Sequence, residues 1–474
     1  MSPDRPNVLV ICGDEHTRDL LGCAGNSMVS TPHLDELAAG GTRFSSGYTP
    51  YPICGPARAA LATGRYAHQL DMWDSASPYD GSVRSWAHRL RDHGYDVASI
   101  GKLHFRGGDD NGFAQEIHPM YATDGVGWVR GLLRSEPWIL TDVCSTFAND
   151  IGPGESTYTE YDRAIASSAV SWLERATDTA EPWALFVSFM APHFPLIAPD
   201  AFFSQYRAGD MPWPVRYGRD NRPDHPVVRA IADALDYGAG FDDERVGQAV
   251  AGYYALCSFL DHNIGLVLEA LGPAADDTLI VYTSDHGEML GTSGLWAKSF
   301  MYEPSVGVPL IIRGPGVAAE TVLDAAVSLV DVYPTVLAAA GIELDEQDAD
   351  LAGSSLLDIT PDTNRTAFSE YHDGGSPTAS FMLRTDHWKY VHHVGFEPQL
   401  FDLDADPTEA LDLADDPGHR AVLDSCERDL RTMVDVDEAN ERAFADQARR
   451  IEAFGGADAV RIWGDFGYTP LEAS

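Results

Sequence analysis

The sequence predicts an α/β fold, with a large and mostly parallel β-sheet that carries helices on both faces. Apolar, β-branched runs alternate with helical patterns along residues 1–365. Polar residues follow several of these runs directly, at the place where parallel sheets collect their ligands. From residue 366 to residue 474 the pattern changes to short strands separated by turns. We therefore expect a large α/β domain at 1–365 and a small α+β domain at 366–474.

The first strand is expected over the apolar run Val8–Cys12, which ends in the polar sequence Gly-Asp-Glu at 13–15. A helix follows in "STPHLDELAAGG", with Ser30 or Thr31 as its N-terminal cap, a proline in its first turn, and Gly40 as its end. Carboxylates at the tip of a buried strand are the first candidates for chemistry.

The remaining elements follow from the same patterns. A helix is expected over 328–342, and the Pro-rich, charged stretch 200–244 is interpreted as a lid or a loop. Short antiparallel strands and a helix near 418–434 are expected in the C-terminal domain. The other expected strands are 96–100, 183–190, 278–283 and 308–312, and the other expected helices are 84–93, 158–177 and 245–271.

Composition excludes several classes of protein. The net charge is −41, from 73 acidic and 32 basic residues, so the chain is expected to repel nucleic acid and anionic membranes. No uncharged stretch is long enough to span a bilayer, and charged residues interrupt the first twenty positions. The six cysteines form no CxxC pair, which favours a reducing compartment. We expect a cytoplasmic protein and leave a homo-oligomer open.

Lysine is so scarce that its positions are informative. The chain has three lysines, and two of them, Lys102 in "GKLHF" and Lys298 in "GLWAKSF", lie in the segments that follow strands. Arginine is the common basic residue elsewhere in the chain, so a position that keeps lysine is expected to need a compact ammonium. This suggests that Lys102 and Lys298 bind an oxyanion such as sulfate or phosphate. Lys389, in "HWKYVHH", is interpreted as a surface residue without a role.

Three clusters at strand ends could bind a metal ion: Asp14 with Glu15, Asp285 with His286, and the element 51–69. Hard divalent cations prefer carboxylate oxygens, and carboxylates brought together from distant strands need a cation between them. The element 51–69 contains Cys54, which could be a buried thiol, a catalytic thiolate or the precursor of another group.

Two histidines extend this pattern. His104 lies two residues after Lys102, and His193 lies in "APHFP", where prolines restrict the backbone on both sides. Imidazole titrates near neutral pH, so either side chain could transfer a proton.

The stretch "CGPARAALATGRY" resembles the signature of the type I sulfatases, which belong to the alkaline phosphatase superfamily. The resemblance extends to "PNVLVICGDEHTRDLLGCAGN", "GYDVASIGKLHF", "APHFP", "LIVYTSDHGE", "VPLIIRGPG" and "PQLFDLDADPTE", so it spans nearly the whole chain. It implies an alkaline-phosphatase-like α/β/α sandwich. The positions that match the signature are Cys54, Pro56, Arg58, Leu61, Thr63, Gly64 and Arg65.

The resemblance implies that a maturation enzyme oxidises Cys54 to Cα-formylglycine, whose hydrated aldehyde attacks the sulfur of a sulfate ester. It also implies one divalent cation, Ca²⁺ in the first place and Mn²⁺ or Mg²⁺ otherwise. The matching ligands are Asp14, residue 54, Asp285 and His286. Glu15 departs from the pattern, because many sulfatases have a second Asp at this position.

The same resemblance assigns the other roles. Arg58 would hold the formylglycine, Lys102 and Lys298 the sulfate oxygens, and His104 the proton of the hydrated aldehyde. The leaving oxygen would be served by His193 or Lys298.

The Asp-His pair at 285–286, "GKLHF" and "SEYHDGG" are similar to the choline sulfatase and phosphonate monoester hydrolase branch. Trp128 in "GVGWVRG" would then belong to an aromatic cage for a quaternary ammonium. The expected activity is hydrolysis of a small sulfate ester. A phosphonate monoester or phosphodiester hydrolase with the same nucleophile and metal is the alternative, and a non-catalytic anion-binding scaffold is a third interpretation.

Overall fold

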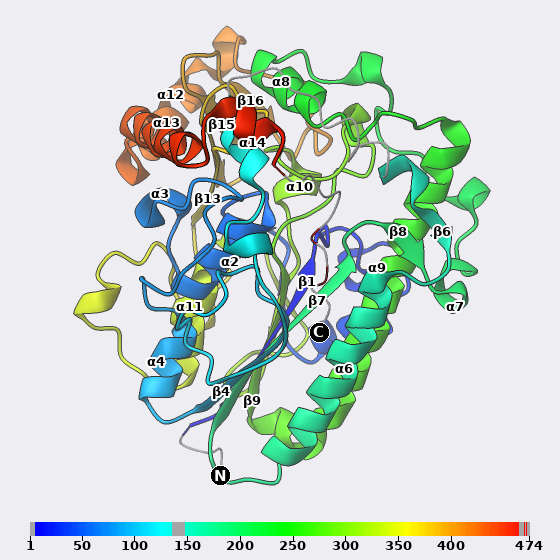
Figure 1. Cartoon of the computed structure of the whole chain (residues 1–474), viewed down its shortest axis with the longest axis vertical. Coiled ribbons are helices and arrows are strands. Elements are labelled where there is room, and N and C mark those ends of the chain that lie inside the picture. The colour runs from blue at the N-terminus through cyan, green and yellow to red at the C-terminus, as the bar shows by residue number, and fades with distance from the viewer. Residues whose placement is uncertain (1–4, 135–146, 464–468, 470, 472–474) are drawn as a thin grey trace.

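The computed structural model describes residues 5–134, 147–463, 469 and 471, and an eight-stranded sheet forms its centre (Figure 1). Its strands are β1 (Asn7–Asp14), β2 (Thr42–Phe44), β4 (Asp96–Lys102), β5 (Gln115–Met120), β7 (Trp183–Pro192), β9 (Thr278–Ser284), β10 (Leu310–Arg313) and β11 (Thr321–Leu323). Their order across the sheet is β11-β2-β10-β9-β1-β7-β4-β5, and β10 alone among them runs antiparallel to its neighbours. The predicted mostly parallel sheet is confirmed.

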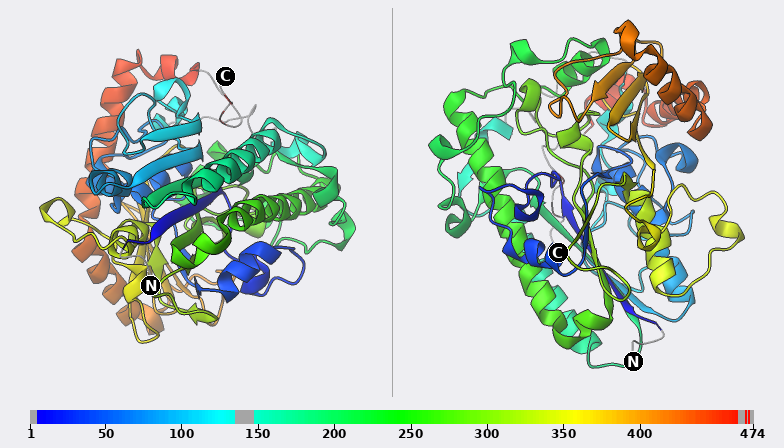
Figure 2. Two further views of the ribbon diagram at one scale, coloured as in Figure 1. Left: turned by 90° about the horizontal axis from the view of Figure 1, so that it is seen from below. Right: turned by 180° about the vertical axis from the view of Figure 1, so that it is seen from behind.

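Helices cover both faces of this sheet, which gives the predicted three-layer sandwich (Figures 1 and 2). One face carries α1 (Pro32–Ala39), α6 (Thr157–Ala176) and α9 (Asp243–Leu271), and the other carries α2 (Cys54–Thr63), α4 (Trp86–Asp92) and α11 (Val332–Ala339). The central strand β1 serves both layers, because side chains alternate along a strand. Leu9 and Ile11 join the core beneath α6 and α9, whereas Val8, Val10 and Cys12 join the core beneath α2, α4 and α11.

Helix α1 begins where the sequence predicts, with Thr31 at its N-cap position, but the Thr31 side chain does not provide the expected cap. The Thr31 hydroxyl does not cap the helix; it accepts from the Gly22 amide at 2.9 Å and donates to Asp35 at 3.1 Å. The free amides of the first turn, those of His33 and Leu34, donate instead to the buried carboxylate of Asp261 in α9, at 3.2 and 2.8 Å. A neighbouring helix therefore caps α1, which local sequence cannot reveal.

The C-terminal region forms a separate antiparallel sheet, as predicted. Its strands are β13 (Thr366–Tyr371), β14 (Ser380–Thr385), β15 (Trp388–His393) and β16 (Gln399–Asp402), and they pair in sequence order. The predicted helix near 418–434 is α12 (Arg420–Met433). A further long helix, α13 (Val436–Ala453), and the short α14 (Ala457–Arg461) were not predicted. A domain boundary at residues 365 and 366 stays a prediction.

The stretch 200–244 is more than the expected loop, since it contains α7 (Asp200–Phe203) and α8 (Pro226–Ala234). Val227, Val228 and Ile231 of α8 share an apolar core with Met382 and Val391 of the C-terminal sheet. This packing holds the stretch 200–244 against the C-terminal sheet.

Other short helices and strands are α3 (Ala67–Leu70), α10 (Glu303–Val306), β3 (Gly47–Tyr48), β6 (Ile151–Pro153), β8 (Leu196–Ala198) and β12 (Val327–Ser328). Within these residues, no helix combines the length and the apolar character needed to cross a membrane. The five described cysteines are free thiols, and Cys144 lies outside the described residues.

Candidate active site

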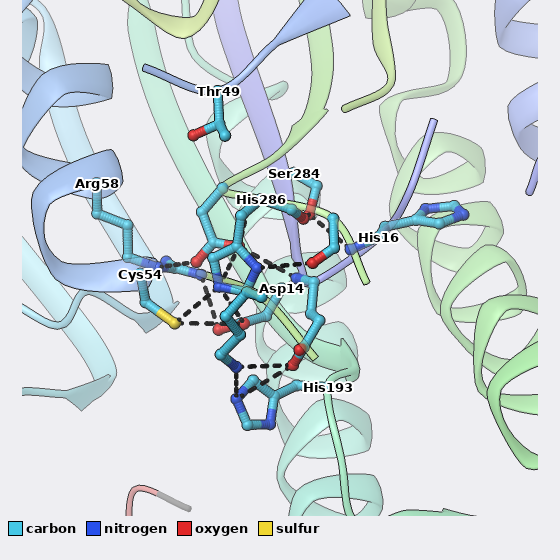
Figure 3. Close-up of polar contacts among 12 residues, drawn as sticks. Asp14, His16, Thr49, Cys54, Arg58, His193, Ser284 and His286 are labelled. Atoms are coloured by element: carbon cyan, nitrogen blue, oxygen red, sulfur yellow. Dashed lines mark hydrogen bonds and ion pairs between the residues drawn. The ribbon is translucent and has the colours of Figure 1, made fainter. Parts of the chain in front are cut away.

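The ends of two neighbouring strands and the start of one helix converge on a single point. Strand β1 ends at Asp14, and the parallel strand β9 beside it is followed by Asp285 and His286. Cys54 is the first residue of α2. The potential ligand atoms of these four buried residues all lie within 4.8 Å of one another (Figure 3). The structure thus brings together the four residues that the sequence indicated as metal ligands.

The donor set fits one hard divalent cation. The Nδ1–H of His286 donates to the carbonyl oxygen of Gly287 at 3.1 Å, so the lone pair of Nε2 points into the cluster. Nε2 lies 3.1 Å from Cys54 Sγ and 3.8 Å from one oxygen each of Asp14 and Asp285. Two buried carboxylates at this separation repel each other, and a cation between them would balance their charge.

Arg58 holds the two carboxylates from behind. Its Nε donates to Asp285 Oδ2 at 2.8 Å and its Nη2 to Asp14 Oδ2 at 3.2 Å. Its Nη1 donates to Ser188 Oγ at 2.8 Å and to the carbonyl oxygen of Lys102 at 2.9 Å. Because the guanidinium binds the outer oxygens, the inner oxygens of both carboxylates face His286 and Cys54.

The Lys102 ammonium is buried and forms an ion pair with Asp14 Oδ2. Burial alone would raise the pKa of Asp14, but Lys102, with His193 and Arg58, holds it well below its ordinary value. Asp14 is therefore ionised, as a metal ligand must be.

On the other side of Asp14, Lys298 lies between two side chains. Its Nζ is 2.8 Å from Glu15 Oε2 and 2.7 Å from His193 Nε2 (Figure 3). The Nδ1–H of His193 donates to the carbonyl oxygen of Phe194 at 2.6 Å, so Nε2 accepts a hydrogen bond from the Lys298 ammonium. Burial alone would lower the pKa of Lys298, but the Glu15 carboxylate raises it above its ordinary value, so the group is an ammonium.

Glu15 does not belong to the group of four converging ligands. Its carboxylate oxygens could form a second group with Asp14 and His193. The Lys298 ammonium, however, already contacts Glu15 and His193, and it supplies a positive charge at that place. Burial opposes the charge on the Glu15 carboxyl, and the Lys298 ammonium, 2.8 Å away, favours that charge by lowering the pKa of the carboxyl.

His104 lies on the same side as Lys102, with its backbone in the left-handed region at φ 60°. Its Nε2 is 3.2 Å from Thr469 Oγ1, and its buried Nδ1 has no hydrogen-bond partner among the described residues. Burial and the nearby Lys102 ammonium lower its pKa well below the ordinary value, which leaves a neutral imidazole with a nitrogen to offer.

The structure places Trp128 at the N-terminal end of a short turn, where its indole packs over two glycines. A Cβ on Gly374 would lie 3.0 Å from the indole ring, and one on Gly131 would lie 3.1 Å from it. Trp128 also packs against the apolar core shared by the start of α2 and the C-terminal sheet.

Lys389 is not the surface residue that we expected. Its side chain is fully buried, and its Nζ lies 3.1 Å from Glu303 and 2.7 Å from Glu409. All three lysines of the chain are therefore buried and paired with carboxylates.

Three polar residues that support the site were not singled out from the sequence. Ser188 is the hydroxyl in the buried run "WALFVSFM" that accepts from Arg58. The buried Asp162 carboxylate accepts from the amides of Met190 and Ala191, at 2.7 and 2.8 Å, just before His193. Glu288 Oε1 accepts from the amide next to Lys298. A polar residue inside an otherwise apolar run was the available signal for Ser188, whereas Asp162 stands among other charged residues in "TEYDRA" and carries no such signal.

Comparison with known proteins gives consistent matches. A family model described as Sulfatase matches residues 6–342, and one described as N-sulphoglucosamine sulphohydrolase, C-terminal, matches residues 291–435. The chain is 33% identical to a choline-sulfatase of Rhizobium meliloti (strain 1021), over 95% of this chain and 91% of that protein. It is 30% identical to arylsulfatase K of Danio rerio, over 92% of this chain and 84% of that protein. The crystal structure of a phosphonate monoester hydrolase of Agrobacterium radiobacter superposes with a TM-score of 0.74 at 25% identity, over 90% of this chain and 95% of that one.

Proposed function

Because this chain belongs to the sulfatase family of sulfuric ester hydrolases, we propose that it hydrolyses a small anionic sulfate ester to an alcohol and inorganic sulfate. The observation that carries the proposal is the group of four converging ligands with a buried lysine on each side. Such a site is strongly positive locally once a cation is bound, although the whole chain carries a charge of −41. This local positive charge would attract an anionic ester in spite of the negative charge of the whole chain.

Two groups complete the site in this proposal. Cys54, converted to Cα-formylglycine by a maturation enzyme, would supply the nucleophile. One divalent cation, Ca²⁺ in the first place and Mn²⁺ or Mg²⁺ otherwise, would be held by Asp14, residue 54, Asp285 and His286 and would draw charge from the sulfuryl oxygens. Glu15 is left out of this ligand set.

The side chains around them divide the remaining work. Lys102 and Lys298 bind sulfate oxygens, and Arg58 fixes residue 54 together with the two carboxylates that it contacts. His104 accepts a proton at Nδ1, the nitrogen that has no partner among the described residues. Of the pair His193 and Lys298, the lysine has the protons to give, because Nε2 of His193 already accepts from it. We therefore assign hydrogen bonding to the leaving oxygen to Lys298, with His193 as its partner.

The alcohol part of the substrate is the open question, and Trp128 tests one answer. If Trp128 forms part of an aromatic cage for a quaternary ammonium, Trp128→Ala should raise KM for choline sulfate by about tenfold or more. KM for an uncharged alkyl sulfate of similar size should change far less. An equal rise in KM for both substrates would show that Trp128 has only a packing role.

The alternative activity, on phosphonate monoesters or phosphodiesters, is favoured by the likeness to phosphonate monoester hydrolases from two bacteria, with TM-scores of 0.74 and 0.72. Both reactions develop charge on tetrahedral oxyanions, so one site can serve either. A panel of aryl sulfates, choline sulfate, aryl phosphonates and phosphodiesters separates them. Faster turnover of sulfates supports the proposal, and much faster turnover of phosphonates or diesters would replace it. Verified, metal-loaded protein that hydrolyses none of them would support the non-catalytic interpretation.

Conversion of Cys54 is tested by mass spectrometry of the tryptic peptide that begins at Phe44. Formylglycine makes this peptide about 18 Da lighter than the unmodified thiol form. A cytoplasmic location stays a prediction, which cell fractionation can test. A homo-oligomer, which we also leave open, can be detected by light scattering.

A further inference from the structure

We infer that Glu15 is a positioning residue rather than a metal ligand: its carboxylate holds the Lys298 ammonium, and through it the His193 imidazole, beside the reacting group. The inference rests on the proposed function for its kinetic consequence, but its geometry stands alone. Glu15 Oε2 lies 2.8 Å from Lys298 Nζ and 3.3 Å from His193 Nε2. Two acceptor atoms this close are held by the ammonium between them, which donates to both.

The main chain at Glu15 is fixed in a conformation from which its side chain contacts Lys298. Glu15 has a φ of 69°, in the left-handed region that few residues other than glycine adopt. Its amide donates to Asp285 Oδ1 at 3.1 Å, and its carbonyl oxygen accepts from the Tyr253 hydroxyl. The backbone is thus fixed to a candidate metal ligand, Asp285, while the side chain reaches Lys298.

A second carboxyl group fixes Lys298 from its other end. Glu288 Oε1 accepts from the amides of Leu290 and Ala297, each at 2.6 Å. Ala297, directly before Lys298, has a φ of 60°, so this contact holds a backbone conformation that is unfavourable for alanine. The Glu15 carboxylate holds the ammonium of the same lysine, at 2.8 Å. One pair of carboxyl groups therefore fixes both the ammonium and the backbone of Lys298.

Charge pairing makes Glu15 hard to replace. Among the described residues, Glu15 is the carboxylate within ion-pair distance of Lys298, whereas Asp14 is already paired with Lys102 and Arg58. A buried ammonium without its counter-ion is unfavourable and would move toward another acceptor. The carboxylate of Glu15 therefore determines where the proton donor for the leaving oxygen lies.

The scarcity of lysine offers a direct measurement. In metal-loaded protein labelled with [ε-¹³C]lysine, Lys102, Lys298 and Lys389 should give three signals. The variants Lys102→Arg and Lys298→Arg would assign two of these signals by their loss. We expect Glu15→Gln to shift the Lys298 signal and to leave the Lys389 signal in place. The control is Glu155→Gln, because Glu155 pairs with Arg163 on the surface, 2.6 Å away, and should shift none of the three.

Metal content distinguishes a positioning residue from a ligand. Glu15→Gln should bind Ca²⁺ with the stoichiometry and affinity of the wild type in calorimetry, whereas Asp285→Asn should lose at least about tenfold in affinity. Loss of Ca²⁺ by Glu15→Gln to the same degree as by Asp285→Asn, or an unmoved Lys298 signal, would overturn the inference. If Glu15→Gln does not fold, Glu15→Asp shortens the side chain by one methylene and keeps its charge. It should shift the Lys298 signal from its wild-type position, leave the Lys389 signal in place and bind Ca²⁺ as the wild type does, and an unmoved Lys298 signal would overturn the inference.

Kinetics then connects the geometry to the reaction. With Glu15→Gln, kcat should fall by about 10- to 100-fold for sulfate esters of poor leaving groups, and much less for 4-nitrophenyl sulfate, whose leaving oxygen needs little help from a proton donor. Equal losses for both esters would contradict the inference. Neither the NMR nor the calorimetry needs turnover. A wild type that hydrolyses no sulfate ester would therefore remove the proposed function and leave the structural role of Glu15 standing.

Discussion

Arg58 Nε donates a hydrogen bond to Asp285 Oδ2 at 2.8 Å, which joins the helix that begins at Cys54 to the end of a strand 227 residues later. The same guanidinium reaches Asp14 from the first strand at 3.2 Å. One planar side chain thus sets the distance between two carboxylates that would otherwise separate.

We expect Arg58→Lys to fail at this task, although it keeps the charge. An ammonium cannot contact Asp14, Asp285 and Ser188 at once, as the planar guanidinium does. We therefore expect kcat/KM to fall by at least about 100-fold. The free energy of unfolding should fall by about 3 kcal/mol, because buried carboxylates lose a partner. Denaturation and steady-state kinetics check both. The control is Arg163→Lys, at an exposed ion pair. Near-wild-type kinetics for Arg58→Lys would show that the guanidinium is not needed to position the two carboxylates.

Cys54→Ala should abolish turnover and leave the fold intact. The Cys54 side chain is buried at the first position of α2, and alanine fits there with the loss of one small atom. Circular dichroism and thermal unfolding should match the wild type, whereas activity toward every ester in the panel should vanish. Retained activity would exclude residue 54 as the nucleophile.

Much of this site could be predicted because a parallel sheet gathers its strand ends at one edge. Asp14 ends one strand, and Asp285 and His286 follow another strand that turned out to be its neighbour, so their convergence followed from the topology alone. Lys102 and Lys298 were singled out by the scarcity of lysine. Both proved to be buried and paired with carboxylates beside the cluster.

What could not be predicted depends on contacts between distant segments. The direction of Glu15 follows from a left-handed backbone that its own sequence does not favour. The cap of α1 comes from Asp261 on another helix. Lys389 looked exposed because a strand pattern does not reveal which faces of an antiparallel sheet are covered; here α10 and the loop around Glu409 cover it.

Lys102→Arg should be costly in spite of its unchanged charge. Lys102 is 1% exposed and contacts Asp14, so the larger guanidinium has no room to keep that contact and also bind a sulfate oxygen. We expect kcat/KM to fall by about 100-fold or more while the helical signal is retained. The matched control is Arg91→Lys, at an exposed pair with Asp110. Unchanged kinetics in Lys102→Arg would mean that any cation suffices.

Lys389→Met should destabilise the protein without touching the site. The change leaves two buried carboxylates, Glu303 and Glu409, without the ammonium between them, although Arg18 still contacts Glu303 at 2.6 Å. Breaking a buried ion pair from one side costs about 3–5 kcal/mol, which chemical denaturation would show. The double variant Lys389→Met/Glu409→Gln should recover part of the loss. A single variant as stable as the wild type would show that the pair contributes nothing.

Acid should loosen the contact between α8 and the C-terminal sheet through His393. This imidazole is buried in β15, bonded to Ser380 Oγ at 2.8 Å, and its ring centroid lies 4.2 Å from that of His225 at the start of α8. Burial, and then His225, lower the pKa of His393 from 6.5 to about 3. The unfolded chain therefore binds a proton below pH 6.5 that the folded chain does not bind until about pH 3.

The sign follows from this difference in bound protons. The contribution of His393 to stability is fully present above pH 6.5 and is lost as the pH falls toward 3, with a limiting slope of about 1.4 kcal/mol per pH unit. Between pH 7.5 and 5, the free energy of unfolding of His393→Gln should therefore fall less steeply than that of the wild type. The exposed His118 provides the control, since His118→Gln should keep the wild-type slope. Parallel curves for His393→Gln and the wild type would show that His393 binds its proton equally well in both states, and that acid acts on this contact through another group.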